Sequence, residues 1–271
     1  MDTLELADTT VRYEVRGDGD PVVLLHANPF VDWYLPVIER MPHYSFVRYT
    51  RLPRGDTPLS MARDAATCAQ LAEHLGWGRA HVVGHSAGAL AALQLAVDAP
   101  DLVHTLCLLE PAVASPSADQ PEHEEDDPFA PIVEAYARGD NETAIERFLE
   151  LVCGAGSRAV LEQAVPGAFE HAVQACDLFL RVEAPAILEG AQAVRQDVFT
   201  KELAERVKAP VLNVVGERSK PGFVEGAQAV QTWFPRAERF TLPDATHLLM
   251  VEQPDAMTAE LLRFFEAHPL Y

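Results

Sequence analysis

Long apolar runs are absent from this sequence. No stretch of 18 or more apolar residues occurs among its 271 residues, so we expect no membrane-spanning helix. The first fifteen residues, MDTLELADTTVRYEV, carry acidic side chains and lack the basic start and apolar centre of a signal peptide. Both absences lead us to expect a cytoplasmic protein.

Cysteines are few and widely spaced. The four of them, Cys68, Cys107, Cys153 and Cys176, form no C-x-x-C pair. Closely spaced cysteines are typical of zinc sites and of disulfide-stapled scaffolds, and neither pattern is present. We therefore expect no metal site and no disulfide framework, which agrees with a reducing compartment.

Basic residues are also scarce. The 21 Lys and Arg residues are outnumbered by 41 Asp and Glu residues, and the formal net charge is −20. Such a field repels phosphate backbones, so we expect no nucleic-acid partner and interpret the charge as a solubility feature. Hydrophobic residues make up 48% of the chain, enough for one large α/β domain with an insertion or for two small domains.

Apolar runs of strand length recur along the chain. Two alternating runs at the start predict antiparallel strands, and the later continuous runs predict strands buried on both faces of a sheet. The continuous or weaker runs are Pro21–His26, Ser45–Thr50, Ala80–His85, Leu102–Glu110, Ala209–Gly216 and Arg236–Leu242. Helical patterns lie between them at Met61–Leu75, Ala87–Val97 and Asp255–Ala267. This alternation predicts a mostly parallel sheet with helices on both faces.

The alternation breaks between Ala112 and Lys208, where no convincing strand occurs. An acidic, proline-containing stretch, SPSADQPEHEEDDP, reads as an exposed loop, and helical patterns follow it at Ile132–Ala137, Glu142–Val152 and Ala159–Leu180. A helical insertion in such a protein is most simply a cap over the carboxyl edge of the sheet, where open α/β sheets carry their sites. We therefore expect a core domain of residues 1–111 and 209–271 and a helical cap of residues 112–208.

The stretch Gly84-His85-Ser86-Ala87-Gly88 fits the pattern G-x-S-x-G between a strong strand and a strong helix. A serine in this tight turn presents its hydroxyl above the sheet, and glycines on either side avoid steric collisions. The N–H of Ala87 then lies at a helix N-terminus, where an oxyanion is stabilised. Ser86 is therefore the candidate nucleophile.

A serine nucleophile needs a base, and the chain has ten histidines. His247 follows the last strand and precedes the last helix, at the same edge of the sheet as Ser86. His85 adjoins the nucleophile, so we expect its side chain to point elsewhere. His26 ends a strand, and we expect it to brace the loop that follows. His247 is therefore the candidate base.

These segments resemble the α/β-hydrolase superfamily over nearly the whole chain. LLHANPF is similar to its oxyanion loop, GHSAG to its nucleophile elbow and DATHLLMVEQP to its histidine loop. The resemblance implies an eight-stranded α/β-hydrolase fold with the cap inserted after strand 6, and no cofactor. By position, the N–H of Asn28 would complete the oxyanion hole with Ala87. HANPF also resembles haloalkane dehalogenases, but these use an Asp nucleophile, which Ser86 rules out.

The acid of the triad is less obvious. In most of the superfamily it follows the seventh strand, where this chain has Ser219, and a hydroxyl cannot stabilise an imidazolium. Glu110 ends a buried strand directly before a proline, and an acid after the sixth strand is a known alternative in the superfamily. We expect Glu110 to be the acid, and Glu217 and then Asp244 remain alternatives.

The pocket is expected to be mainly apolar. We expect Phe30 and Trp33, with Tyr34, to line it from the oxyanion side, and Leu248 and Met250 to line it from the histidine loop, while the cap contributes residues such as Phe129, Tyr136, Phe179 and Leu180. This lining favours a small apolar acyl or aromatic substrate, and it leaves a homodimer open.

Three functions remain in competition. The first is a serine hydrolase that cleaves a carboxylic ester, lactone or thioester through an acyl-enzyme. The second is a biosynthetic cyclase, lyase or acyltransferase on the same fold. The third is a non-catalytic small-molecule-binding protein that has kept the pocket. The fold by itself does not separate them, because one fold hosts many chemistries.

Overall fold

An eight-stranded sheet forms the centre of the protein. The computed structural model describes residues 1–53, 60–113, 128–185, 187 and 201–270, without the side chains of Asn28, Pro53 and Lys201. The strands are β1 Asp2–Glu5, β2 Thr9–Arg16, β3 Asp20–Leu25, β4 Tyr44–Pro53, β5 Ala80–His85, β6 Val103–Leu109, β7 Val211–Gly216 and β8 Glu238–Leu242. Their order in the sheet is β1-β2-β4-β3-β5-β6-β7-β8.

The pairing of the strands follows their hydrophobic patterns. β5 and β7 are buried at every residue, as expected for strands covered on both faces, whereas β2 near the edge alternates. β1 pairs with β2, and β2 with β4, in the antiparallel sense, and all other neighbours are parallel. The mostly parallel sheet predicted from the apolar runs is confirmed.

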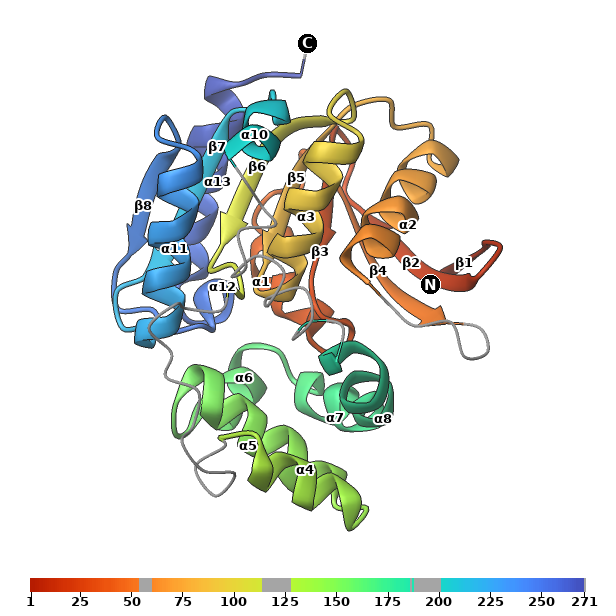
Figure 1. Cartoon of the computed structure of the whole chain (residues 1–271), viewed down its shortest axis with the longest axis vertical. Helices are drawn as coiled ribbons and strands as arrows, with labels where there is room; N and C mark the ends of the chain where they lie inside the picture. Colours follow the sequence, from red (N-terminus) through yellow and green to blue (C-terminus); the bar gives the residue numbers. More distant parts are fainter. Residues whose placement is uncertain (54–59, 114–127, 186, 188–200, 271) are drawn as a thin grey trace.

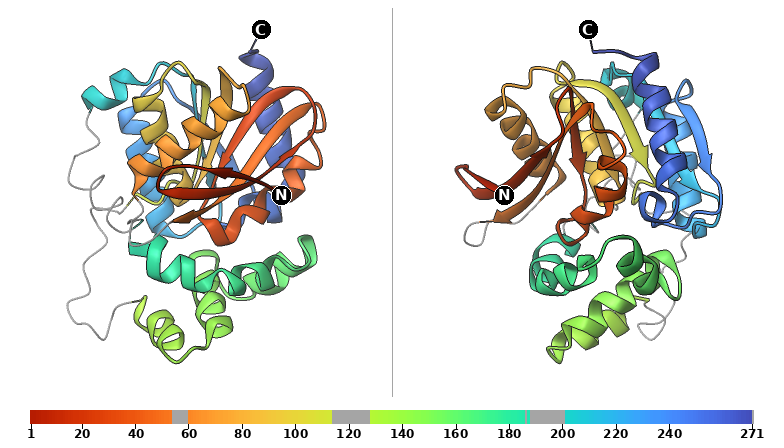
Figure 2. Two further views of the ribbon diagram at one scale, coloured as in Figure 1. Left: turned by 90° about the vertical axis from the view of Figure 1, so that its right-hand side faces the viewer. Right: turned by 180° about the vertical axis from the view of Figure 1, so that it is seen from behind.

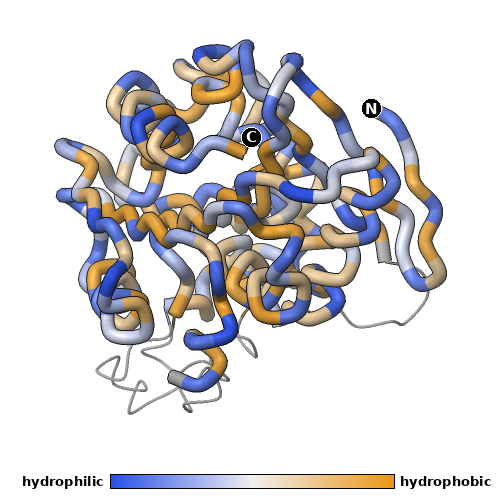
Figure 3. The backbone as a smooth tube through the Cα atoms, turned by 90° about the horizontal axis from the view of Figure 1, so that it is seen from above, coloured by the Kyte–Doolittle hydropathy of each residue, from blue (hydrophilic) through white to orange (hydrophobic). Residues whose placement is uncertain are grey.

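Helices cover both faces of the sheet (Figure 1). α2 Met61–His74, α3 Ala87–Asp98, α10 Lys201–Arg206 and α11 Pro221–Trp233 lie on one side, and α1 Leu35–Ile38 and α13 Pro254–Ala267 lie on the other. A short helix, η1 Asn28–Tyr34, follows β3, and another, α12 Leu249–Glu252, directly precedes α13. Figure 3 shows longer apolar stretches in the central segments and mixed polar and apolar residues on the outer helices. In the described part of the chain no helix is long and apolar enough to cross a membrane.

The helices that follow β6 form a separate layer at the carboxyl ends of the parallel strands (Figures 1 and 2). They are α4 Ala130–Ala137, α5 Asn141–Cys153, α6 Ser157–Ala164, α7 Ala168–Gln174, α8 Cys176–Leu178 and the π-helical turn η3 Phe179–Glu183. One apolar cluster runs from the sheet into this layer. The acidic stretch lies outside the described residues except for Pro128, so the cap boundaries 112–208 stay a prediction.

Three features differ from the sequence expectation. A single helix was expected over Ala159–Leu180, but it is divided, because Pro166 has no N–H to donate and Gly167 has a left-handed φ of 86°. β4 extends to Pro53, beyond the weak apolar run that predicted it. α11 was not expected, since GFVEGAQAVQTW contains two glycines and little regular apolar spacing.

Candidate active site

Ser86 occupies the turn between β5 and α3 with φ 56° and ψ −122°, a conformation that L-residues rarely adopt. A Cβ atom on Gly84 would lie 2.6 Å from the Gly88 oxygen, and one on Gly88 would lie 2.1 Å from the Leu25 oxygen. The glycines are therefore required because α3 approaches β5 and the end of β3 closely. Side chains in place of these glycines would therefore collide with α3 and with the end of β3, and not with Ser86 itself.

Two helices begin near Ser86. Ala87 and Asn28 are the first residues of α3 and η1, and the N–H groups of first-turn residues have no acceptor within their own helix. A Cβ atom on Gly88 would lie 2.5 Å from the His26 nitrogen, so the first turn of α3 lies close to the segment that leads into η1. Ala27 and Ala87 both line the cavity above Ser86. The side chain of Asn28 lies outside the described part of the structure.

Glu110 directly follows β6 and is completely buried. It has a positive φ of 43°, which turns the chain as the strand ends. Its Oε2 atom lies 2.6 Å from Nδ1 of His247. Its Oε1 atom accepts hydrogen bonds from the N–H of Gly216, at 2.6 Å, and from the Ser219 hydroxyl. The carboxylate of Glu110 is therefore held by the last residue of β7 and by the loop that follows it.

Burial and hydrogen bonding act on this carboxylate in opposite directions. Desolvation is the larger influence and raises the pKa of Glu110 to about 7, although the donors Ser219 and Gly216 oppose this rise because they stabilise the ionised form. Desolvation also lowers the pKa of His247 to about 3, which keeps the free imidazole neutral. A neutral imidazole can accept a proton as a general base, and the ionised form of Glu110, which the two donors favour, is the form that stabilises the resulting imidazolium.

The two alternative acids lie away from His247. Glu217 is exposed, and its Oε2 accepts a hydrogen bond from the N–H of Asp244 at 3.0 Å. Asp244 has a left-handed φ of 54°, as expected of a turn residue. Together they stabilise the turn between β8 and the histidine loop. Of the three candidate acids, the structure brings Glu110 alone to His247.

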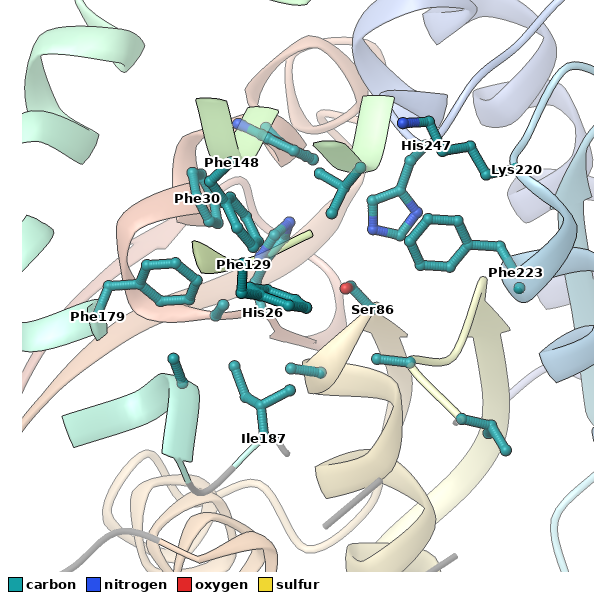
Figure 4. A pocket seen from close by; sticks show the side chains of 18 residues that line it. His26, Phe30, Ser86, Phe129, Phe148, Phe179, Ile187, Lys220, Phe223 and His247 are labelled. Carbon is teal, nitrogen blue, oxygen red and sulfur yellow. The ribbon is translucent and has the colours of Figure 1, made fainter. Parts of the chain in front are cut away.

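His247 and Ser86 line the same cavity (Figure 4). With Nδ1 bound to Glu110, the other ring nitrogen, Nε2, makes no hydrogen bond to the described residues. Figure 4 shows the imidazole and the Ser86 hydroxyl on one side of this space. The arrangement leaves Nε2 available to a proton of the Ser86 hydroxyl or of a bound molecule.

Two other histidines come closer to the site than expected. His85 was expected to point away, but its ring lies 4.4 Å from the His247 ring, centroid to centroid. His26, expected to brace a loop, lines the cavity, and its Nε2 lies 2.9 Å from Nδ1 of His85. Burial lowers the pKa of His26 and of His85 well below its usual range, so both rings are neutral. No sequence signal distinguished these contacts, because they join separate strands.

The cavity above Ser86 has a volume of about 310 Å³, and its walls are mainly apolar. Six aromatic side chains line it, namely Phe30, Trp33, Phe129, Phe148, Phe179 and Phe223. Phe148 of α5 stacks on Phe30 of η1 with ring centroids 5.4 Å apart, so the helical layer and the core share one wall. The walls also contain one permanent charge among the described residues, Lys220, whose ammonium donates to the carbonyls of Glu150, at 3.0 Å, and Leu151.

Some expected pocket residues do not reach this cavity. Phe30 and Trp33 line it, but Leu248 and Met250 are buried in the apolar core, because the chain enters α12 at Leu249, shortly after His247. Tyr34 donates its hydroxyl to the backbone oxygen of Leu25 instead. Phe148 and Phe223, which the sequence did not single out, take their place.

Comparisons with known proteins agree with this architecture. The sequence profile of the alpha/beta hydrolase family matches residues 6–260. An alpha/beta hydrolase from Sphaerobacter thermophilus is 24% identical, with a TM-score of 0.73 over 97% of this chain and 100% of that one. A thermophilic esterase from Thermogutta terrifontis is 19% identical, with a TM-score of 0.71 over 99% and 100%. Naproxen esterase from Bacillus subtilis is 20% identical, with a TM-score of 0.67 over 97% and 90%.

Proposed function

This chain belongs to the alpha/beta hydrolase family, and from that premise we propose that it cleaves a carboxylic ester, lactone or thioester with Ser86, Glu110 and His247 as its catalytic triad. The observation that carries the proposal is the 2.6 Å hydrogen bond between Glu110 Oε2 and His247 Nδ1, beside a cavity that Ser86 also lines. A carboxylate, an imidazole and a serine in this order are the groups needed to activate a hydroxyl nucleophile.

The proposed reaction proceeds through an acyl-enzyme. His247 accepts the proton of the Ser86 hydroxyl at Nε2 while the serine oxygen attacks the substrate carbonyl. The amides of Ala87 and Asn28 donate to the oxyanion, which carries the charge that develops in the transition state. The protonated His247 then gives its proton to the leaving group, and a water molecule, activated in the same way, releases the acid.

Glu110 has two roles in this cycle. By accepting from Nδ1–H it keeps the proton-free nitrogen, Nε2, directed at Ser86, and it stabilises the imidazolium that forms in each half of the reaction. The N–H of Gly216 and the hydroxyl of Ser219 favour the ionised carboxylate and so oppose the effect of its burial.

The aromatic walls support an apolar substrate. A cavity of about 310 Å³ lined by six aromatic rings accommodates an alkyl or aryl acyl group and offers few partners for sugar hydroxyls or peptide amides. Two of the similar structures are named as esterases, which supports the cleavage of an ester bond. Because Phe148 and Phe179 come from the helical layer, we also propose that residues 112–208 act as a substrate-binding cap.

A p-nitrophenyl ester series of increasing acyl length, assayed with the wild type and with Ser86→Ala, tests the proposal. We expect the wild type to hydrolyse the esters and to react with a fluorophosphonate probe. Ser86→Ala is expected to lose the labelling and to reduce kcat by about 10⁴-fold or more. Unchanged labelling in Ser86→Ala would refute Ser86 as the nucleophile. A wild type that neither reacts nor hydrolyses would favour the binding-protein alternative.

A further inference from the structure

The imidazole of His247 lies between two rings that the reaction described above does not use. The phenyl ring of Phe223 stacks on it, with centroids 3.8 Å apart and planes 11° apart. The ring of His85 contacts it at 4.4 Å and 35°. Phe223 and His85, both described, make no ring contact with each other, so they approach the imidazole from different sides.

Phe223 owes its place to the loop that holds Glu110. It is the third residue of α11, and its N–H donates to the Lys220 oxygen at 3.0 Å in the first turn of that helix. α11 begins at Pro221, two residues after Ser219. Figure 4 shows the phenyl ring beside the imidazole at the wall of the cavity. The same loop therefore orders the acid on one edge of His247 and an aromatic face on its flat side.

The proposed function makes this stacking chemically relevant, because the ring acquires a positive charge in each half-reaction. Aromatic faces carry partial negative charge and attract cations within about 6 Å of the ring centre. We propose that Phe223 is a positioning residue, which fixes the plane of the His247 ring and stabilises its imidazolium form through the stacked π face.

Few other groups near His247 can stabilise a charge. Glu110 is its hydrogen-bonded counter-charge, and burial keeps His85 and His26 neutral by lowering their pKa values. Lys220 shares the cavity, but its ammonium donates to backbone carbonyls at the end of α5. Glu252 of α12 accepts from the N–H of Thr246 at 2.6 Å instead of from the imidazole. The indole of Trp33 lies farther away, with ring centroids 6.4 Å apart and planes 80° apart, so it does not stack on the imidazole. The stacked face of Phe223 is therefore a second source of stabilisation beside Glu110.

Two replacements of Phe223 test the role of its π face. Phe223→Leu keeps an apolar side chain, and pentafluorophenylalanine at position 223 keeps the shape of the ring but removes its negative face. In both we expect kcat to fall about threefold to thirtyfold. We expect the acid limb of kcat/KM to move to lower pH, because a neighbour that stabilises the cation raises the pKa of His247 and its loss lowers that pKa. Unchanged kcat and an unchanged acid limb would overturn the proposal.

Phe148→Leu is the matched control, because Phe148 lines the same cavity but stacks on Phe30 rather than on His247. It is expected to change KM and to leave the acid limb in place. An equal shift of the limb in Phe148→Leu would assign the effect to general polarity of the cavity and would overturn the role of Phe223.

A substrate-free measurement separates this proposal from the proposed function. NMR titration of ¹⁵N-labelled His247, over the pH range in which circular dichroism shows an intact fold, compares the wild type with the fluorinated protein. We expect His247 to bind its proton at lower pH in the fluorinated protein. Equal titration curves would overturn the stacking role whether or not the wild type hydrolyses esters, and an absence of hydrolysis would count against the proposed function alone.

Discussion

The segments after β6 and β7 contribute differently to the surroundings of His247. The first supplies a charge, since Glu110 directly follows β6 and binds Nδ1 of the imidazole. The second supplies donors, since Gly216 and Ser219 bind the far oxygen of the same carboxylate. Ser219 stands at the position where most of the superfamily has its acid, yet it makes no hydrogen bond to His247. The difference shows that the carboxylate bound to His247 follows β6, whereas the segment after β7 holds that carboxylate in place.

The strongest way to break this comparison is to remove the charge of the β6 loop. Glu110→Gln keeps the shape of the side chain but removes its charge and disturbs the tautomer of His247. We expect kcat/KM for a p-nitrophenyl ester to fall by about 10² to 10⁴. Near-normal activity of Glu110→Gln would mean that another group serves as the acid.

A second substitution returns a charge to the β7 loop. In the Glu110→Gln background, Ser219→Asp places a carboxylate at the commoner position, close enough to favour the imidazolium. We expect the double variant to recover about tenfold in kcat/KM over Glu110→Gln alone, as a nearby opposite charge would. Ser219→Asn in the same background is the control, and an equal recovery there would show that charge is not the cause.

The donor role of the β7 loop is tested by Ser219→Ala, which removes one hydrogen bond to the buried carboxylate. We expect a loss of about tenfold in kcat/KM, the size expected for a hydrogen bond to a charged group. Because the Ser219 hydroxyl lowers the pKa of Glu110, its removal makes the hydrogen-bonded pair of Glu110 and His247 bind its proton more readily, and the acid limb of kcat/KM moves to higher pH. Ser219→Thr keeps a hydroxyl and should keep the limb in place, and a limb unmoved in Ser219→Ala would contradict the donor role.

The smallest effect is expected at Glu217, the acidic residue in the loop after β7. Glu217 is exposed and accepts from the N–H of Asp244, so Glu217→Gln removes a surface charge far from the imidazole. We expect kcat/KM to change by about twofold or less, as for most surface substitutions. A crippled Glu217→Gln beside a normal Glu110→Gln would reverse the assignment of the two loops.

Local patterns were sufficient for the sheet, because a strand buried on both faces must be apolar throughout. β5 and β7 show this in the sequence and in their complete burial. Local patterns were less informative for α11 and for the helix expected over Ala159–Leu180. Two glycines obscure the spacing of the first, and the break at Pro166 and Gly167 divides the second. Helices of this kind depend on packing against neighbouring elements more than on their own propensity.

The candidate site shows the same division. The turn at Ser86 depends on a strand, two glycines and a helix that are consecutive in the chain, so the pattern G-x-S-x-G predicts its geometry. The pocket could not be predicted in this way. Leu248 and Met250 follow His247 in sequence but turn into the core with α12, whereas Phe148 and Phe223 reach the cavity from distant segments.

The sequence by itself determined the sheet, the strained serine turn and the three candidate acids, because each depends on residue type and on short-range spacing. Only the tertiary structure decided which acid reaches His247, that Ser219 serves Glu110, and that Phe223 stacks on the imidazole. The physical reason is that these contacts join atoms of different strands and helices. Their distances are set by how the sheet twists and how the helices pack on it, which no local pattern of residues records.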